Sequence, residues 1–167
     1  LGKDKFKQGI KGFLEKYKFS SATSDDYWKA FEESTGEPVQ EFANSWVHQK
    51  GFPYVSVKRN NGFLSLSQKR FTILDNYEET TWFLPIKILL IKEDGTTEFM
   101  DLVMKNAKMK VELPDNVKYF KLNAKQIGFY RVNYELKQWN KLGEIIKDKV
   151  LNPIDRFGLI NDFIAMT

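Results

Sequence analysis

The sequence has 167 residues, enough for one ordinary domain or for a small domain with parts of its neighbours. Apolar residues make up 42% of the chain and aromatic residues 15%, which excludes a disordered protein. The formal charge is +4, but 26 basic residues are interleaved with 22 acidic ones, which favours a solvated surface over a phosphate-binding patch. The absence of cysteine excludes disulfides and thiolate metal sites.

The first fifty residues predict three helices. The apolar residues from 3 to 19 recur at helical spacing. "T-S-D-D" at 23–26 provides a hydroxyl cap and first-turn acids for a second helix, which ends before Gly36. Pro38 suits the first turn of a third helix, whose end is marked by Gly51 and Pro53. The first helix carries the stripe Phe6, Ile10, Phe13, Leu14 and Tyr17.

After Pro53 the hydrophobic period changes from 3.6 to 2. "N-N-G" at 60–62 predicts a hairpin between "YVSV" and "FLSLSQKRF", and "E-D-G-T" at 93–96 predicts a second hairpin. Further strands fit the segments 108–113, 118–122 and 129–134. We therefore predict a mixed fold with α and β in separate segments, in which an antiparallel β-sandwich of about seven strands is flanked by N-terminal and C-terminal helices.

The end of the chain returns to helical spacing. Leu136, Trp139, Leu142, Ile146 and Val150 predict one helix. "N-P-I-D-R" at 152–156 gives the next helix an Asn cap, Pro in its first position and Asp in its first turn. That helix carries an apolar stripe of Ile154, Phe157, Ile160 and Ile164. No apolar run reaches the roughly 20 residues that span a bilayer, and we expect both ends to be cut points in a longer polypeptide.

Residues that could carry chemistry are few. The single histidine, His48, has no second His or Cys with which to share a metal, so we interpret it as a helix-terminus or packing residue. Ser65 and Ser67 alternate along a strand without a G-x-S-x-G turn. The adjacent acid pairs fit caps and solvated loops, and no phosphate-binding glycine motif is present. The pairs are Asp25–Asp26, Glu32–Glu33 and Glu78–Glu79.

The stretch "I-G-F-Y-R-V-N-Y", residues 127–134, partly matches an RNA-recognition pattern at Gly128, Phe129, Val132 and Tyr134. Ile127 stands where the pattern has a basic residue, and Arg131 stands where it has an aromatic residue that stacks on a nucleotide. An RNA-binding domain is therefore a lesser alternative. Arg131 lies on the strand face opposite to Tyr130, Val132 and Tyr134. We interpret it as a structural residue that ties the last strand of the sandwich to the adjoining helices.

Six segments, in this order, resemble the zinc aminopeptidases of the aminopeptidase N type. The W-x-x-Q-x-G-x-P and G-x-Y-R-V-N-Y signatures within them are specific, and the resemblance covers essentially the whole chain. The segments are "LGKDKFKQGIKGFLEKYKFSSATSDDYWKAF" (1–31), "SWVHQKGFPYVSV" (45–57), "LSQKRF" (66–71), "TWFLPI" (81–86), "NAKQIGFYRVNY" (123–134) and "DRFGLINDFIAM" (155–166).

This resemblance implies that residues 1–51 are the C-terminal helices of a thermolysin-like catalytic domain. It implies that residues 52–134 are the β-sandwich domain and that 135–167 are the first helices of the C-terminal helical domain. In the family, zinc activates the water that attacks the first peptide bond of a peptide substrate. The H-E-x-x-H helix, its distant Glu ligand and the G-x-M-E-N motif are not in this sequence. We therefore predict no catalytic, cofactor-binding or metal-binding residue here.

The resemblance predicts a non-catalytic fragment, inactive alone and binding no zinc, that acts as a structural spacer and hinge. Its expected partners are the catalytic and C-terminal helical domains of its own chain, with no nucleic acid and no membrane segment. A stand-alone β-sandwich that binds a protein partner is the other alternative. The lack of cysteine and of N-x-[ST] sequons favours a cytoplasmic location, although the family also has membrane-anchored members.

Overall fold

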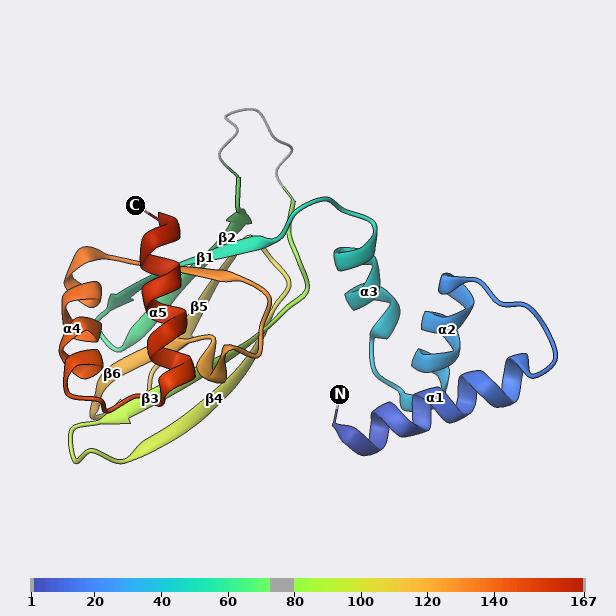
Figure 1. Ribbon diagram of the computed structural model, residues 1–167, viewed down its shortest axis with the longest axis horizontal. Helices are drawn as coiled ribbons and strands as arrows, with labels where there is room; N and C mark the ends of the chain where they lie inside the picture. The colour runs from blue at the N-terminus through green and yellow to red at the C-terminus, as the bar shows by residue number, and fades with distance from the viewer. Residues whose placement is uncertain (1, 73–79, 167) are drawn as a thin grey trace. The chain divides into compact units, whose positions relative to one another are not determined.

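The computed structural model describes residues 2–72 and 80–166, so the acid pair Glu78–Glu79 lies outside the described residues. The chain forms two compact units, Leu1–Lys50 and Gly51–Thr167. Helices make up the first unit, and strands followed by helices make up the second (Figure 1). The two units are described separately.

Three helices build the first unit: α1 (Lys3–Tyr17), α2 (Ser24–Thr35) and α3 (Val39–Val47). The predicted cap of α2 is confirmed as a capping box, in which Thr23 Oγ1 accepts from Asp26 N and the Asp26 carboxylate accepts from Thr23 N. Gly36 ends α2 with a φ of 69°, a left-handed conformation that glycine adopts without strain. Pro38 precedes α3 as its N-cap.

Aromatic rings hold α1 against α2. Phe31, which is buried, lies 5.6 Å from the ring of Phe6, and Phe13 packs edge-on against Tyr27 at 4.9 Å. The close approach of the helices depends on Gly9, because a Cβ at this position would lie 2.4 Å from the Phe31 ring.

Replacing Gly9 by alanine is therefore expected to destabilise the first unit by about 1–3 kcal/mol, because the rigid buried ring of Phe31 has to move. Gly143→Ala is the matched control, since Gly143 is also inside a helix but a Cβ there meets no atom within 4 Å. The control is expected to raise stability by about 0.5–1 kcal/mol. Amide hydrogen exchange in α1 and α2 measures the first effect, and unchanged protection in Gly9→Ala would contradict this packing.

Seven strands in the described part of the second unit form two sheets, as the predicted mixed fold with a sandwich requires. One sheet has the order β5-β2-β1-β7 and the other β4-β3-β6. The strands are β1 (Pro53–Asn60), β2 (Phe63–Arg70), β3 (Leu84–Lys92), β4 (Thr97–Met104), β5 (Lys108–Glu112), β6 (Val117–Leu122) and β7 (Arg131–Tyr134).

The two predicted hairpins are confirmed. The turn Asn61–Gly62 has positive φ at both residues, 35° and 81°, and joins β1 to β2 with Asn60 opposite Phe63. Gly95, with a φ of 83°, lies in the turn from β3 to β4. Among the described strands, β1 and β7 run parallel, with Val55 opposite Val132, and the other pairs are antiparallel.

A buried glutamine connects the two layers of the second unit. Gln68 on β2 donates from Nε2 to the carbonyl of Trp82 at 3.0 Å and accepts from Trp82 N at 2.8 Å. Trp82 precedes β3 and its side chain is fully buried. Both the NH2 group and the carbonyl of the Gln68 side chain are hydrogen-bonded, so these bonds compensate the cost of burying the amide in the core.

Two helices follow the strands: α4 (Leu136–Lys147) and α5 (Pro153–Met166) (Figure 1). The stripe of apolar residues on α5 exists at the predicted spacing, but Ile154, Phe157, Ile160 and Ile164 are all exposed. The buried residues of α5 are instead Asp155, Gly158, Leu159 and Asp162. Helix α5 thus turns two carboxylates toward the sandwich, the reverse of an ordinary amphipathic helix.

Candidate functional site

Each residue that could have carried chemistry has a structural place in its own unit. His48 is the C-cap of α3, as the helix-terminus interpretation predicts, and its Nε2 lies 3.8 Å from Asp25 Oδ1 with both side chains exposed. Ser65 and Ser67 lie on β2 between buried neighbours. Among the described residues, no group of three or more His, Cys, Asp or Glu side chains is placed to hold a metal ion. The described helices are also too short or too polar to cross a membrane.

The stretch that partly matched an RNA-recognition pattern is used internally. Val132 and Tyr134 are 1% and 3% exposed, so neither side chain can stack on a base. Phe129 is exposed, but its ring lies 5.1 Å from that of Phe52. Arg131 points to α5, where its Nη1 lies 3.4 Å from Asp162 Oδ1. The predicted contact of Arg131 with an adjoining helix is therefore present.

Around Arg131, five polar residues connect β6, β7 and the loop between them to α5. We call them the junction cluster: Lys121, Asn123, Arg131, Asp155 and Asp162. Four of the five are buried, and Arg131 is half-buried. Buried charges of this kind are costly unless they are paired, so their partners decide what the cluster does.

The strongest contact in the junction cluster joins Lys121 on β6 to Asp155 in the first turn of α5. Lys121 Nζ donates to Asp155 Oδ1 at 2.8 Å and to the carbonyls of Leu122 and Asn123 at 3.0 and 2.9 Å. Both charged side chains are 1% exposed. Burial lowers the pKa of Lys121, and the hydrogen bond to Asp155 opposes that shift. All three ammonium protons have an acceptor.

Asp155 is equally well satisfied because of its place at the start of α5. Its Oδ1 also accepts from Lys125 N at 2.7 Å, and its Oδ2 accepts from Asn152 Nδ2 at 2.6 Å. Asn152 in turn accepts from Asp155 N at 2.9 Å, so the predicted Asn cap is confirmed. The helix dipole adds to these contacts, since a carboxylate in the first turn is favoured.

Asn123 shapes the loop that meets α5. It has a left-handed backbone, with a φ of 52°, as Asn tolerates more readily than most residues. Its side chain donates to the carbonyl of Gly128 at 2.9 Å and accepts from Gly128 N at 2.8 Å. Lys125 and Gln126 also have positive φ, and Gln126 lies so close to Gly158 of α5 that a Cβ there would be 1.9 Å from its Nε2. Glycine at 158 therefore lets the loop contact the helix directly.

Tyr134 and Gln138 link the two sheets and α4 to the same region. Tyr134 OH on β7 accepts from Leu122 N on β6 at 2.9 Å, which joins one sheet to the other. Burial raises the pKa of Tyr134, so this hydroxyl stays protonated. Gln138 on α4 donates to the carbonyl of Phe120 at 3.3 Å. The last strands and both helices thus meet around β6.

The Arg131–Asp162 contact is longer and more exposed than the Lys121–Asp155 pair. Asp162 is 3% exposed, yet its ion-pair partner Arg131 lies at 3.4 Å and is itself half-buried. Burial raises the pKa of Asp162 to about 6, although the hydrogen bond and charge of Arg131 act in the opposite direction. A backbone hydrogen bond from Val132 also favours the carboxylate, so Asp162 is bound by β7 but less closely than Asp155 is bound by its three donors.

Of the junction cluster, the sequence predicts a contact with the adjoining helices for Arg131 alone, and it predicts Asp155 only as an acid in the first turn of a helix. Lys121 sits in an alternating strand, and Asp162 looks like an ordinary solvated residue of an amphipathic helix. One signal was present: Asp155, Gly158 and Asp162 recur at helical spacing, which places them on one face. The cluster's polar groups bind one another, so its chemistry is that of a structural joint.

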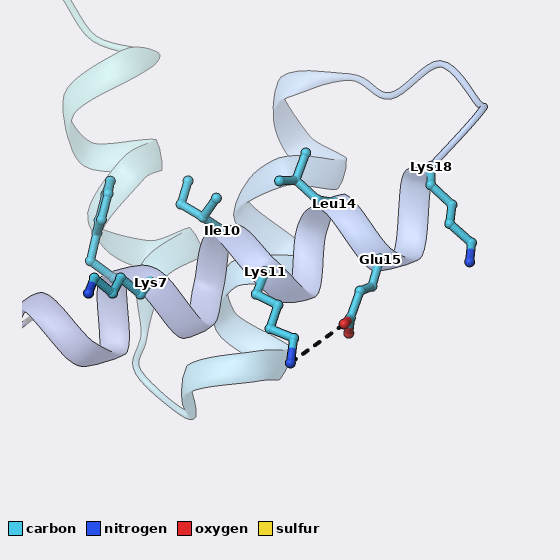
Figure 2. Close-up of a pocket in the computed structure, with 7 residues that line it drawn as sticks. Lys7, Ile10, Lys11, Leu14, Glu15 and Lys18 are labelled. Carbon is cyan, nitrogen blue, oxygen red and sulfur yellow. Dashed lines mark ion pairs between the residues drawn. The ribbon is translucent and has the colours of Figure 1, made fainter.

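A second surface feature lies in the first unit. A shallow groove along α1 is lined by apolar and charged residues (Figure 2). Within it, Lys11 is paired to Glu15 at 3.7 Å. Its lining is Phe6, Lys7, Ile10, Lys11, Leu14, Glu15 and Lys18. The groove has no buried polar group that could fix a ligand.

Comparison with known proteins identifies the class to which this sequence belongs. The model of the Peptidase family M1 domain matches residues 1–46, and that of the ERAP1-like C-terminal domain matches residues 119–167. The chain is 30% identical to Aminopeptidase M1 of Arabidopsis thaliana over its whole length. It is 32% identical to Glutamyl aminopeptidase of Homo sapiens over 98% of its length, and 31% identical to Probable aminopeptidase 2 of Sulfurisphaera tokodaii over 98%.

These matches define a sequence of the aminopeptidase class. The chain belongs to the M1 aminopeptidase family, of the aminopeptidase N type. It spans 18–20% of the length of these three relatives.

Proposed function

We propose that this chain is a non-catalytic part of a zinc aminopeptidase that removes N-terminal residues from peptides. In this proposal residues 1–51 complete the catalytic domain, 52–134 form a spacer, and 135–167 begin the C-terminal helical domain. The sandwich sets how the helical domain is held relative to the catalytic domain, as inter-domain elements do in enzymes that open and close. A cytoplasmic location is a further prediction.

The junction cluster is the observation that supports the spacer role. A spacer can set the position of one domain relative to another only if its own contacts are rigid. The Lys121–Asp155 pair joins β6 to α5 with every donor and acceptor of the pair used. Loss of one partner leaves an unpaired buried charge, so the pair holds one arrangement strongly. Any hinge therefore lies outside the contact between the sandwich and the first turn of α5.

Zinc does not fit the residues present. The described part of the chain offers no set of three ligands, and tetrahedral zinc takes three or four protein ligands. The metal and its hydrolytic chemistry would be supplied by other parts of the full-length enzyme, and no step of the reaction is assigned to residues of this chain.

The test has two arms. The 167-residue chain, incubated with zinc and then freed of excess metal, is expected to retain much less than one zinc per chain and to leave aminoacyl fluorogenic substrates intact. Retention of one zinc per chain, or hydrolysis of the substrates, would overturn the proposal that this chain is non-catalytic. Retention on immobilised RNA that falls with salt would support the RNA-binding alternative instead.

The second arm uses the full-length polypeptide that contains this sequence. There Asp155→Asn is expected to lower aminopeptidase activity without changing the zinc content, because it loosens the spacer and leaves the metal site intact. Asp101→Asn, in an exposed pair with Lys87, is the matched control and is expected to keep full activity. Equal activity of both variants would contradict the spacer role.

A further inference from the structure

The four-stranded sheet of the second unit carries a polar hollow on its outer face. Side chains alternate along β1 and β2, so that residues such as Val55 and Leu64 are buried while those between them point outward. Together with β5, the outward residues form two cross-strand rows. The first row is Ser56, Ser67 and Lys108, and the second is Lys58, Ser65 and Lys110.

These six side chains line one shallow hollow of about 400 Å³, which we call the serine hollow. Its three serines are half-buried and lie on the central strands, whereas its three lysines are exposed and lie at the two ends of the rows. Neighbouring strands are about 4.8 Å apart, and residues two apart on one strand are about 7 Å apart. The six groups therefore converge on an area that a short peptide segment covers.

Folding gathers charge of one sign here, although basic and acidic residues are interleaved along the sequence. Lys58 is paired with Glu135 at 3.2 Å. Within the described chain, Lys108 and Lys110 have no acidic partner, and Lys110 Nζ lies 4.0 Å from the centroid of the Phe63 ring. None of the described residues that line the hollow is acidic. A concave surface with charge of one sign concentrates ions of the other sign.

The floor of the serine hollow adds uncharged donors to these cations. The hydroxyls of Ser56, Ser65 and Ser67 have no hydrogen-bond partner in the part of the chain that the structure describes. Hydroxyl and ammonium groups both donate to carboxylate oxygens, and hydrogen bonds to an ionised acceptor are stronger than those between neutral groups. The hollow thus combines donors without an acceptor and cations without a counter-charge, which suits an anionic ligand.

We propose that the serine hollow binds an extended acidic segment of a partner protein. Carboxylates two residues apart on an extended segment are separated by about 7 Å, the same spacing as Lys108 and Lys110 along β5. Nucleic acid fits less well, because hydroxyls on the floor give bases no ring to stack on, and Lys110 covers the neighbouring ring of Phe63. The hollow is separate from the junction cluster, so this inference does not depend on the proposed spacer role.

The first measurement maps amide NMR shifts of the 167-residue chain on addition of acetylated hexaglutamate, with hexaglutamine as the neutral probe of equal length. Hexaglutamate is expected to shift amides of β1, β2 and β5 around the hollow, and hexaglutamine is not. Raising NaCl from about 50 to about 300 mM should weaken binding about fivefold, because the contacts are ionic. Equal shifts with both probes, binding that salt leaves unchanged, or shifts confined to the basic helix α1 would overturn the proposal.

The second measurement is the affinity for labelled hexaglutamate, by fluorescence anisotropy. Lys108→Gln combined with Lys110→Gln is expected to weaken binding about tenfold, since two charge-assisted contacts are lost. Lys147→Gln removes an exposed lysine of α4, outside the hollow, and should change affinity less than about twofold. Ser65→Ala with Ser67→Ala should weaken binding as well. Unchanged affinity in the double lysine variant refutes the proposal, and tighter binding of hexauridylate than of hexaglutamate would assign the hollow to nucleic acid instead.

Discussion

Replacement of Asp155 by asparagine is expected to destabilise the unit of residues 51–167 by about 3–5 kcal/mol. Asparagine has nearly the same volume and can still accept from Lys125 N. It cannot neutralise Lys121, whose ammonium group is 1% exposed and would remain as an unpaired buried charge. The lost stability comes mainly from the unpaired buried charge of Lys121, so it is larger than the net contribution of the ion pair to stability.

The measurement is amide hydrogen exchange in β6 and β7, which reports this unit without contributions from α1–α3. Asp101→Asn breaks an exposed pair with Lys87 and should change stability by less than about 1 kcal/mol. The double variant Lys121→Met with Asp155→Asn should lose clearly less stability than the sum of the losses in the two single variants. Each single substitution leaves the other charged group buried and unpaired. A loss below about 1 kcal/mol in Asp155→Asn would mean that the pair is not buried in solution.

Local features of this fold could be predicted from the sequence. The turn at Asn61–Gly62 needs two positive φ angles, which these two residues adopt readily, so it can be recognised without knowledge of the rest of the chain. The cap by Asn152 is similarly determined by residues three positions apart. The aminopeptidase resemblance rested on motifs of the same short range, and the comparisons support it.

Apart from the general expectation that Arg131 contacts an adjoining helix, contacts between distant residues could not be predicted. The parallel pairing of Val55 with Val132 joins the first strand to the last, and alternation within either strand is the same for both directions. The orientation of α5 is a stronger case, because hydrophobicity alone places Phe157 and Ile160 inside. Asp155 and Asp162 are buried because Lys121 and Arg131 arrive from β6 and β7, and only the folded chain brings these charges together.

Replacement of Asp162 by asparagine is expected to have the opposite sign to that of Asp155, although both remove a buried carboxylate from the same face of α5. Burial of the ionised Asp162 is unfavourable overall, as its pKa of about 6 shows. The rise from 3.8 corresponds to about 3 kcal/mol, so a neutral side chain of the same shape should stabilise the unit by about 1–3 kcal/mol above pH 7. Arg131 stays solvated, because its side chain is 26% exposed.

The pH dependence makes this prediction specific. A group with a raised folded pKa contributes stability that is fully present below its unfolded pKa, near 3.8, and is lost as the pH rises through about 6. The advantage of Asp162→Asn over the parent should therefore be constant above pH 7, shrink between pH 6 and 4, and vanish below. Subtracting the two curves removes the contribution of Asp94, an exposed carboxyl whose pKa is lowered by hydrogen bonds from Thr96.

Exchange of the β6 and β7 amides from pH 4 to 8 gives this difference curve. Glu135→Gln, in an exposed pair with Lys58, serves as the control for loss of a surface carboxyl and is expected to change stability by less than about 1 kcal/mol at pH 7.5. If Asp162→Asn is instead less stable than the parent at pH 7.5, the Arg131–Asp162 pair is a net stabilising contact. The two carboxylates of α5 would then act alike. The distinction between them depends on their donors. Asp155 has three donors at 2.6–2.8 Å, whereas Asp162 has a half-buried ion-pair partner at 3.4 Å and a backbone hydrogen bond from Val132. The sign of this one substitution tests whether that difference determines how the helix is held.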